Sequence, residues 1–161
     1  MKIRIAGVVN DSIVDGPGLR YTIFVQGCSH NCPGCQNPQT HDPNTGKETD
    51  TETIIAEIKK NPLLSGITLS GGEPMDQPEA CLALAKAAHA LGLSVWCYTG
   101  YTIEELESMN HPNQITLLKE VDTLVDGPFI LAEKSLNLEF RGSRNQRIIH
   151  MKQKKEIGGR I

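Results

Sequence analysis

The chain has 161 residues, 39% of them hydrophobic, and a formal net charge of −3 at pH 7. This length supports one sizeable hydrophobic core and is too short for two comfortable domains. The charge is unevenly spread, because the segment from Arg141 onward carries seven Lys and Arg residues against one acid. The body before it is therefore acidic, which argues against a nucleic-acid-binding surface on the folded part.

The sequence also disfavours membrane and secreted proteins. No stretch approaches the roughly 20 apolar residues of a membrane-spanning helix. Residues 1–7 lack the apolar core and cleavage site of a secretory signal. We therefore expect a cytoplasmic protein with no membrane or nucleic-acid partner, built as one domain over residues 1–150 with a basic tail over residues 151–161.

Five segments have the alternating or β-branched composition that is typical of strands. The predicted strands are 2–9, 19–25, 66–70, 93–98 and 121–125. Asp15–Gly18 contains strong turn formers and predicts a turn before the second strand. Residues 140–149 are expected to be ordered.

Helices are predicted between the later strands. N-terminal capping patterns stand at Thr49–Glu52, Asp76–Glu79 and Thr102–Glu105, and a further short helix is predicted over 113–119. Strands that alternate with helices predict a parallel sheet with right-handed crossovers. A complete eight-unit barrel usually needs upward of about 200 residues. The expected fold class is therefore α/β, a partial, open-sided (β/α) barrel with a mostly parallel sheet.

Three cysteines follow the second predicted strand in the spacing C-x-x-x-C-x-x-C, at Cys28, Cys32 and Cys35. Thiolates this close in sequence can converge on one metal centre, and three are one fewer than a closed zinc site or a fully ligated iron–sulfur cluster needs. The open position implies a second ligand. Two alternatives remain: His30 or His41 could complete a structural Cys3His zinc site, and Cys32 with Cys35 could form a thioredoxin-like redox pair.

The other two cysteines have different surroundings. Cys81 lies among alanines and leucines, and Cys97 follows Val95-Trp96. We expect both to be small core residues and not metal ligands. An odd cysteine count also argues against a disulfide scaffold.

Glycine-rich loops follow four predicted strands, at Gly27, Gly71, Gly100 and Gly127. In parallel α/β folds, the carboxyl ends of the strands form the ligand-binding edge. In Gly71-Gly72-Glu73, the glycines would let the backbone approach a ligand closely, and the carboxylate could accept a charge-assisted hydrogen bond from an ammonium group. An ordinary strand-to-helix turn is the alternative.

The cysteine spacing resembles the radical S-adenosylmethionine (SAM) family. In that family three cysteines hold three irons of a [4Fe–4S] cluster, and the fourth iron chelates SAM. The resemblance implies this fold type, both cofactors, and the cluster ligands Cys28, Cys32 and Cys35. It also implies that Gly71, Gly72 and Glu73 meet the SAM amino group. Gly34 and Gln36 would line the adenine or cluster edge, and Thr99 and Asp126 the ribose or methionine side, while Tyr98 or Tyr101 could stack on the cofactor.

Further motifs are similar to glycyl-radical activases, and in particular to those of the anaerobic (class III) ribonucleotide reductase. They are Asp15-Gly-Pro-Gly-x-Arg20, Phe24-Val-x-Gly-Cys28, Tyr98-Thr-Gly-Tyr101, Val125-Asp-Gly-Pro-Phe129 and Arg141-Gly-Ser-x-Asn-Gln146. The resemblance implies reductive SAM cleavage, a glycyl radical on the large reductase subunit, and a flavodoxin-like electron donor. The alternatives are an activase of another glycyl-radical enzyme, such as pyruvate formate-lyase, and a zinc-stabilised interaction module without catalysis.

Overall fold

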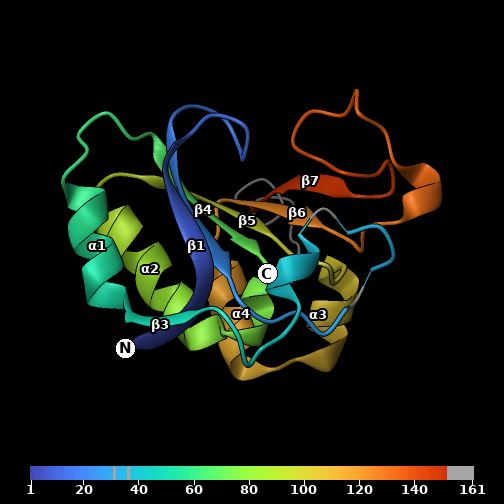
Figure 1. Ribbon diagram of the computed structural model, residues 1–161, viewed down its shortest axis with the longest axis horizontal. Coiled ribbons are helices and arrows are strands. Elements are labelled where there is room, and N and C mark those ends of the chain that lie inside the picture. The colour runs from blue at the N-terminus through green and yellow to red at the C-terminus, as the bar shows by residue number, and fades with distance from the viewer. Residues whose placement is uncertain (31, 36, 152–161) are drawn as a thin grey trace.

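The computed structural model describes residues 1–30, 32–35 and 37–151 (Figure 1). Over these residues, seven strands form one sheet in the order β3-β1-β2-β4-β5-β6-β7. The strands are β1 Lys2–Ser12, β2 Arg20–Val25, β3 Lys47–Asp50, β4 Gly66–Gly71, β5 Ser94–Tyr98, β6 Thr123–Asp126 and β7 Arg147–His150. The helices are α1 Thr51–Lys59, α2 Pro78–Ala90, α3 Ile103–Met109 and α4 Pro112–Glu120, with short 3-10 turns at Pro38–Thr40, Pro74–Asp76 and Leu131–Glu133.

The sheet is mixed, but most of its strands point the same way. β2, β4, β5 and β6 are adjacent and parallel. β1 is antiparallel to both β2 and β3, so β3 points with β2, and β7 is antiparallel to β6. The sheet ends at β3 and β7 without closing on itself. The expected open-sided, mostly parallel α/β sheet is confirmed.

The two outer strands β3 and β7 are the elements that the sequence did not reveal. β3 reads Lys-Glu-Thr-Asp and has no buried residue, so it carries no hydrophobic pattern. β7 was expected only to be ordered, and its four residues are half-buried or exposed. Their backbone pairing with β1 and β6 makes them strands, and such pairing between segments distant in the chain leaves little signal in composition.

Local capping decides where the helices begin, and one of the three predicted patterns is confirmed. At α3, Thr102 Oγ1 accepts a hydrogen bond from Glu105 N, and Glu105 Oε1 accepts one from Thr102 N. The box predicted at Thr49–Glu52 is wrong. α1 starts at Thr51 after Asp50, whose side chain makes no cap bond. The carboxylates of Asp50 and Glu52 instead meet Lys2 and the N-terminal ammonium.

The start of α2 differs from expectation in a similar way. Asp76 belongs to a 3-10 turn, and the residue before the helix is Gln77, whose side chain makes no cap bond. That side chain instead donates to the backbone carbonyls of Arg4 and Gln26. Pro78 stands in the first turn of α2, where a missing backbone N–H leaves no helical hydrogen bond unmade. No helix in the described part of the chain is long and apolar enough to cross a membrane.

The hydrophobic core lies between the sheet and the helices, which Figure 1 shows gathered on one side of the sheet. Alternate residues of the central strands face this core, including Ile23, Ile67, Leu69 and Leu124. Cys81 and Cys97 are fully buried there, as expected. Met151 is also in the core, while the rest of the basic tail predicted over 151–161 lies outside the described residues.

Arg20 is a buried cation on the other face of the sheet. Its guanidinium donates to Thr68 Oγ1, to the carbonyls of Pro17 and Ile67, and to the carbonyl and hydroxyl of Ser94. Burial lowers the pKa of Arg20, the cost of removing this charge from water. Thr68 Oγ1 in turn donates to Asp15 O. The Asp15–Gly18 turn is thereby fixed to the beginnings of the parallel strands.

His89, near the end of α2, links this helix to the end of α4 and to the segment just before β6. Its Nδ1 lies 2.6 Å from Glu120 Oε2 and its Nε2 lies 2.8 Å from Asp122 Oδ2. Burial acts to lower the pKa of His89, but the hydrogen bonds and charges of Asp122 and Glu120 outweigh it, so the pKa is raised.

We predict that His89 stabilises the fold most at low pH. Because the folded-state pKa lies above the unfolded value, the contribution is fully present below the unfolded pKa of about 6.5 and is lost as the pH rises through the folded pKa. The loss of unfolding free energy in His89→Gln should therefore be larger at about pH 6 than at about pH 9. Urea unfolding at both pH values measures it, with His111→Gln as an exposed control. Equal losses at the two pH values would contradict this assignment.

Candidate functional site

A cavity of about 670 Å³ opens over the ends of β2, β4 and β5 and the sheet face opposite the helices. Its lining includes most of the predicted site residues: Cys28, Cys32, Cys35, Gly71, Gly72, Glu73 and Thr99. Residues far apart in the sequence thus meet at one edge of the sheet, as the parallel strand order requires. Gly34 and Asp126 are not among the lining residues, and Gln36 lies outside the described residues.

The cysteine loop leaves β2 and is held at its base by hydrogen bonds. Gly27 N donates to Thr40 O at 2.6 Å, and Cys28 N donates to His41 O at 3.1 Å. The buried Gln26 donates from Nε2 to Gln39 O, Asp42 O and Thr45 Oγ1. These bonds close the loop on itself next to the cavity.

The donor set of this loop fits an iron–sulfur cluster. Cys28, Cys32 and Cys35 are partly exposed thiols outside any disulfide, and all three line the same cavity. A cluster is held by thiolates that each bind a different iron, so its cysteines share a cavity and need not meet at one point. No three His, Cys, Asp or Glu residues within 1–30, 32–35 and 37–151 are grouped so as to hold a metal ion.

The other two cysteines have no such access. Burial raises the pKa of Cys81 and of Cys97, so both remain neutral thiols inside the core. A thiol must lose its proton to bind a metal. The separation of three cavity cysteines from two core cysteines therefore agrees with the sequence analysis.

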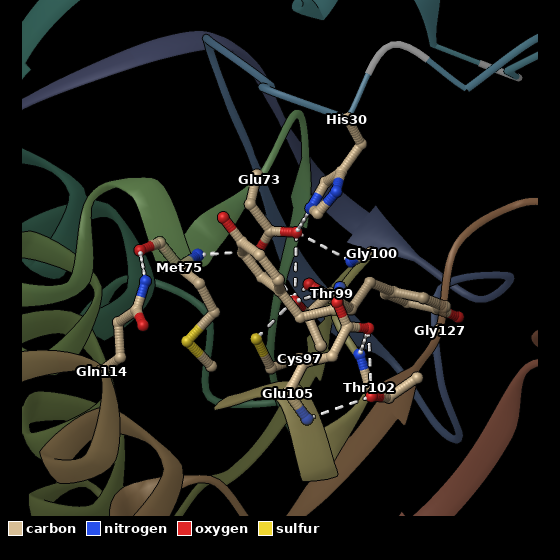
Figure 2. Close-up of polar contacts among 12 residues, drawn as sticks. His30, Glu73, Met75, Cys97, Thr99, Gly100, Thr102, Glu105, Gln114 and Gly127 are labelled. Carbon is tan, nitrogen blue, oxygen red and sulfur yellow. Dashed lines mark hydrogen bonds and ion pairs between the residues drawn. The ribbon is translucent and has the colours of Figure 1, made fainter. Parts of the chain in front are cut away.

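Glu73 is the central polar group of the site (Figure 2). Its carboxylate has no solvent exposure and accepts hydrogen bonds from four groups. Oε1 lies 2.7 Å from His30 Nε2 and 2.7 Å from Gly100 N, Oε2 lies 2.8 Å from Met75 N, and Thr99 Oγ1 lies 3.0 Å from both oxygens. A buried carboxylate is tolerated because it is hydrogen-bonded in this way.

His30 belongs to the cysteine loop and reaches across to this carboxylate. Its ring meets Tyr101 edge-on with centroids 4.4 Å apart. The hydrogen bond to Glu73 is the main reason that the pKa of His30 is raised. The sequence drew attention to His30 only as a possible zinc ligand. Its position midway between Cys28 and Cys32 was the one available signal of a role in the loop.

The glycines at the end of β4 are required by close packing. Gly71 has φ +106°, and a side chain there would press on the backbone of Val25. A side chain at Gly72 would meet the carbonyl of Gly27. Because both residues line the cavity and lack side chains, what they present to a ligand is backbone.

Three other predicted residues take structural positions. Gly34 has φ +71° and packs against the side chain of Leu131. Asp126 is fully buried, and its carboxylate accepts from Ile103 N at the start of α3 and from Arg147. Tyr101 packs on His30, whereas Tyr98 lines the cavity.

The far wall of the cavity comes from residues that the sequence analysis left without a role. Phe129, Leu138, Phe140 and Arg141 line it from the long loop between β6 and β7. Gln146 fixes this loop, since its side chain accepts from the backbone N–H groups of residues 142 and 143 and donates to the carbonyl of residue 127. The motif from residue 141 to residue 146 is thus a self-closing turn that shapes the cavity wall.

Comparison with known protein families finds one match that spans most of the chain. A family described as "4Fe-4S single cluster domain" matches residues 14–149. This range contains the whole cavity lining apart from Val9, Ser12 and Ile13.

Curated relatives named anaerobic ribonucleoside-triphosphate reductase-activating protein are similar to this chain over nearly their whole length. The relative from Vibrio cholerae is 40% identical over 86% of this chain and 91% of its own. The relative from Salmonella typhi is 38% identical over 87% and 94%, and that of Enterobacteria phage T4 is 33% identical over 84% and 86%.

Among solved structures, QueE from Escherichia coli has a similar fold. The TM-score is 0.50 at 18% sequence identity. The match covers 63% of this chain and about half (54%) of the QueE chain. At this identity the likeness concerns the fold alone.

We predict that Cys28, Cys32 and Cys35 are each required for an iron–sulfur cluster. Replacing any of them with alanine removes one thiolate ligand, so anaerobic reconstitution should give little bound iron. Cys81→Ala and Cys97→Ala are the matched controls: each should cost about 1 kcal/mol of stability, as a typical substitution does, with iron content unchanged. Iron and sulfide analysis with the visible spectrum measures the outcome. A full cluster in Cys28→Ala would disprove the ligand assignment.

Proposed function

Since the chain belongs to the family of anaerobic ribonucleoside-triphosphate reductase-activating proteins, we propose that it cleaves SAM reductively at a [4Fe–4S] cluster and generates a glycyl radical on the large subunit of the anaerobic reductase. The observation that carries this proposal is the cavity, which is lined both by three cysteine residues and by the glycine backbone of residues 71 and 72. The three thiols can bind three irons of the cluster. The glycine backbone can bind SAM, the second ligand that would occupy the open position on the fourth iron.

A bound and reduced cluster would supply the one electron needed to split SAM into methionine and a 5'-deoxyadenosyl radical, and that radical could take a hydrogen atom from a glycine Cα. The protein's own contribution is to bind and to position. Cys28, Cys32 and Cys35 would hold the cluster. The backbone at Gly71 and Gly72 would receive the SAM ammonium group, and the carboxylate of Glu73, which lines the same cavity, would favour that positive charge.

The sheet face opposite the helices gives a protein substrate a route to this cavity. The lining on that side includes Ile13 and Val14, each 72% exposed, and the loop residues Phe129, Leu138 and Phe140. A radical must be shielded from water and side reactions. A partner that carries its glycine on a loop would cover the opening when it docks, and glycine would enter with little steric hindrance.

The relatives' name favours the anaerobic reductase over pyruvate formate-lyase as the partner. The family match to a 4Fe-4S domain, together with the engagement of His30 by Glu73, favours a cluster over a Cys3His zinc site. The electron donor in this proposal is a flavodoxin-like protein.

We predict a glycyl radical on the large anaerobic reductase subunit after anaerobic incubation with the reduced protein and SAM. Electron paramagnetic resonance should show the doublet of a glycyl radical, and the doublet should be absent when the acceptor glycine of that subunit is changed to alanine. Pyruvate formate-lyase is the control partner. A radical on that enzyme and none on the reductase would assign the chain to the alternative activase.

A further inference from the structure

We propose that His30 is a positioning residue for the cluster ligands: clasped by Glu73, it fixes the cysteine loop to the ends of β4 and β5. That this loop binds the cluster rests on the proposed function above. The contacts that His30, Glu73 and Gly100 make with one another, called the clasp below, are present in the protein without its cofactors.

Of the four groups that donate hydrogen bonds to Glu73, three belong to segments next to the sheet and one, His30, belongs to the cysteine loop. Met75, Thr99 and Gly100 donate from segments that directly follow β4 and β5, so the sheet determines their positions. His30 donates from the cysteine loop. Since Glu73 follows just after the end of β4, its carboxylate ties the imidazole to the edge of the sheet (Figure 2).

The imidazole also lies in a fitted niche. A Cβ added to Gly100 would stand 2.5 Å from His30 Cδ2, and its three nearest atoms would all belong to the His30 ring. Tyr101 closes another side of the ring. The absence of a side chain at Gly100 therefore makes room for this histidine, a second reason to assign the contact a role.

Because His30 lies between Cys28 and Cys32 in the chain, holding its side chain also restrains the positions of these two thiols. The backbone bonds described above hold the loop at Gly27 and Cys28, whereas His30 holds it between Cys28 and Cys32. Partners that orient metal ligands from outside the ligand set typically change metal affinity by about 10–100-fold. His30 does so here by limiting where two of the three thiols can lie.

The same geometry defines the role of Glu73 toward SAM. A carboxylate that already accepts from four groups has little hydrogen-bonding capacity left for an ammonium. Glu73 therefore acts on the ligand through its charge, while the backbone of Gly71 and Gly72 makes the direct contact. The competing arrangement, in which the SAM ammonium displaces His30 from Glu73, becomes one outcome of the test.

Two His30 variants and one control separate the functions of the side chain. His30→Phe keeps a ring in the niche and loses the donor, His30→Gln keeps a donor of similar reach, and His111→Phe changes an exposed histidine elsewhere. In cluster-free protein, amide hydrogen exchange of the 28–35 segment should quicken in His30→Phe and stay near wild type in the other two. In reconstituted protein, His30→Phe should release iron to a chelator about 10-fold faster or more.

Gly100→Ala tests the niche independently. The φ of Gly100 lies outside the left-handed region, so alanine fits the backbone and conflicts with the His30 ring alone among its nearest neighbours. Gly100→Ala should therefore quicken exchange and iron release as His30→Phe does. In a His30→Ala background, the same substitution should have no further effect.

Three different results would contradict the proposed role of His30. Unchanged exchange in both His30→Phe and Gly100→Ala would show that the contact does not hold the loop. Iron loss in His30→Gln as severe as in His30→Phe would make His30 a metal ligand, and tighter SAM binding in His30→Phe would make it a competitor of SAM. A wild-type protein that takes up no cluster would refute the proposed function, while the exchange data would still decide the clasp.

Discussion

The constraint on which the site depends is the burial of the Glu73 carboxylate at the end of β4. An ionised group without solvent contact is tolerated only when donors surround it, and each hydrogen bond to a charged group is worth roughly 1.5–3 kcal/mol. Thr99 and Gly100 meet this requirement from the end of β5, and Met75 meets it from the turn after Glu73. The relative position of two strand ends is thereby fixed, and the cavity rim with it.

The openness of the molecule follows from its edge strands. A parallel barrel grows by repeated crossovers, but β1 and β7 run antiparallel to their neighbours β2 and β6. In the described part of the chain, no further parallel strand pairs with either side of the β2-β4-β5-β6 block. The helices cover one face of the sheet, and loops lie over the other. That second face carries polar groups such as Thr68 and the buried Arg20, which are satisfied by the 15–18 turn and by neighbouring strands.

Features that depend only on neighbouring residues could be predicted from the sequence. Predictions were wrong or missing where a residue far away in the sequence makes the deciding contact. The parallel strands β2, β4, β5 and β6 have hydrophobic patterns, and the capping box at Thr102 needs only residues within one helical turn. The box at Thr49 is lost because Lys2 and the N-terminus, nearly fifty residues away, take the carboxylates. For the same reason the cysteines could be grouped from their spacing, whereas the four donors around Glu73 could not be foreseen.

Glu73 and Asp126 show how an acidic residue at a strand end should be interpreted. Both are fully buried just beyond or at the end of a parallel strand, and both bind a side chain from a distant segment. Each also accepts a backbone N–H from a helical segment: Glu73 from the 3-10 turn that follows it, and Asp126 from the start of α3, which precedes it in the chain. The distant partner is His30 for Glu73 and Arg147 for Asp126. A carboxylate after a buried strand is thus as well suited to joining loops to the sheet as to binding a ligand. Several protein groups donate to each of these two carboxylates, so both join separate segments of the chain, and Glu73 does so at the lining of the cavity.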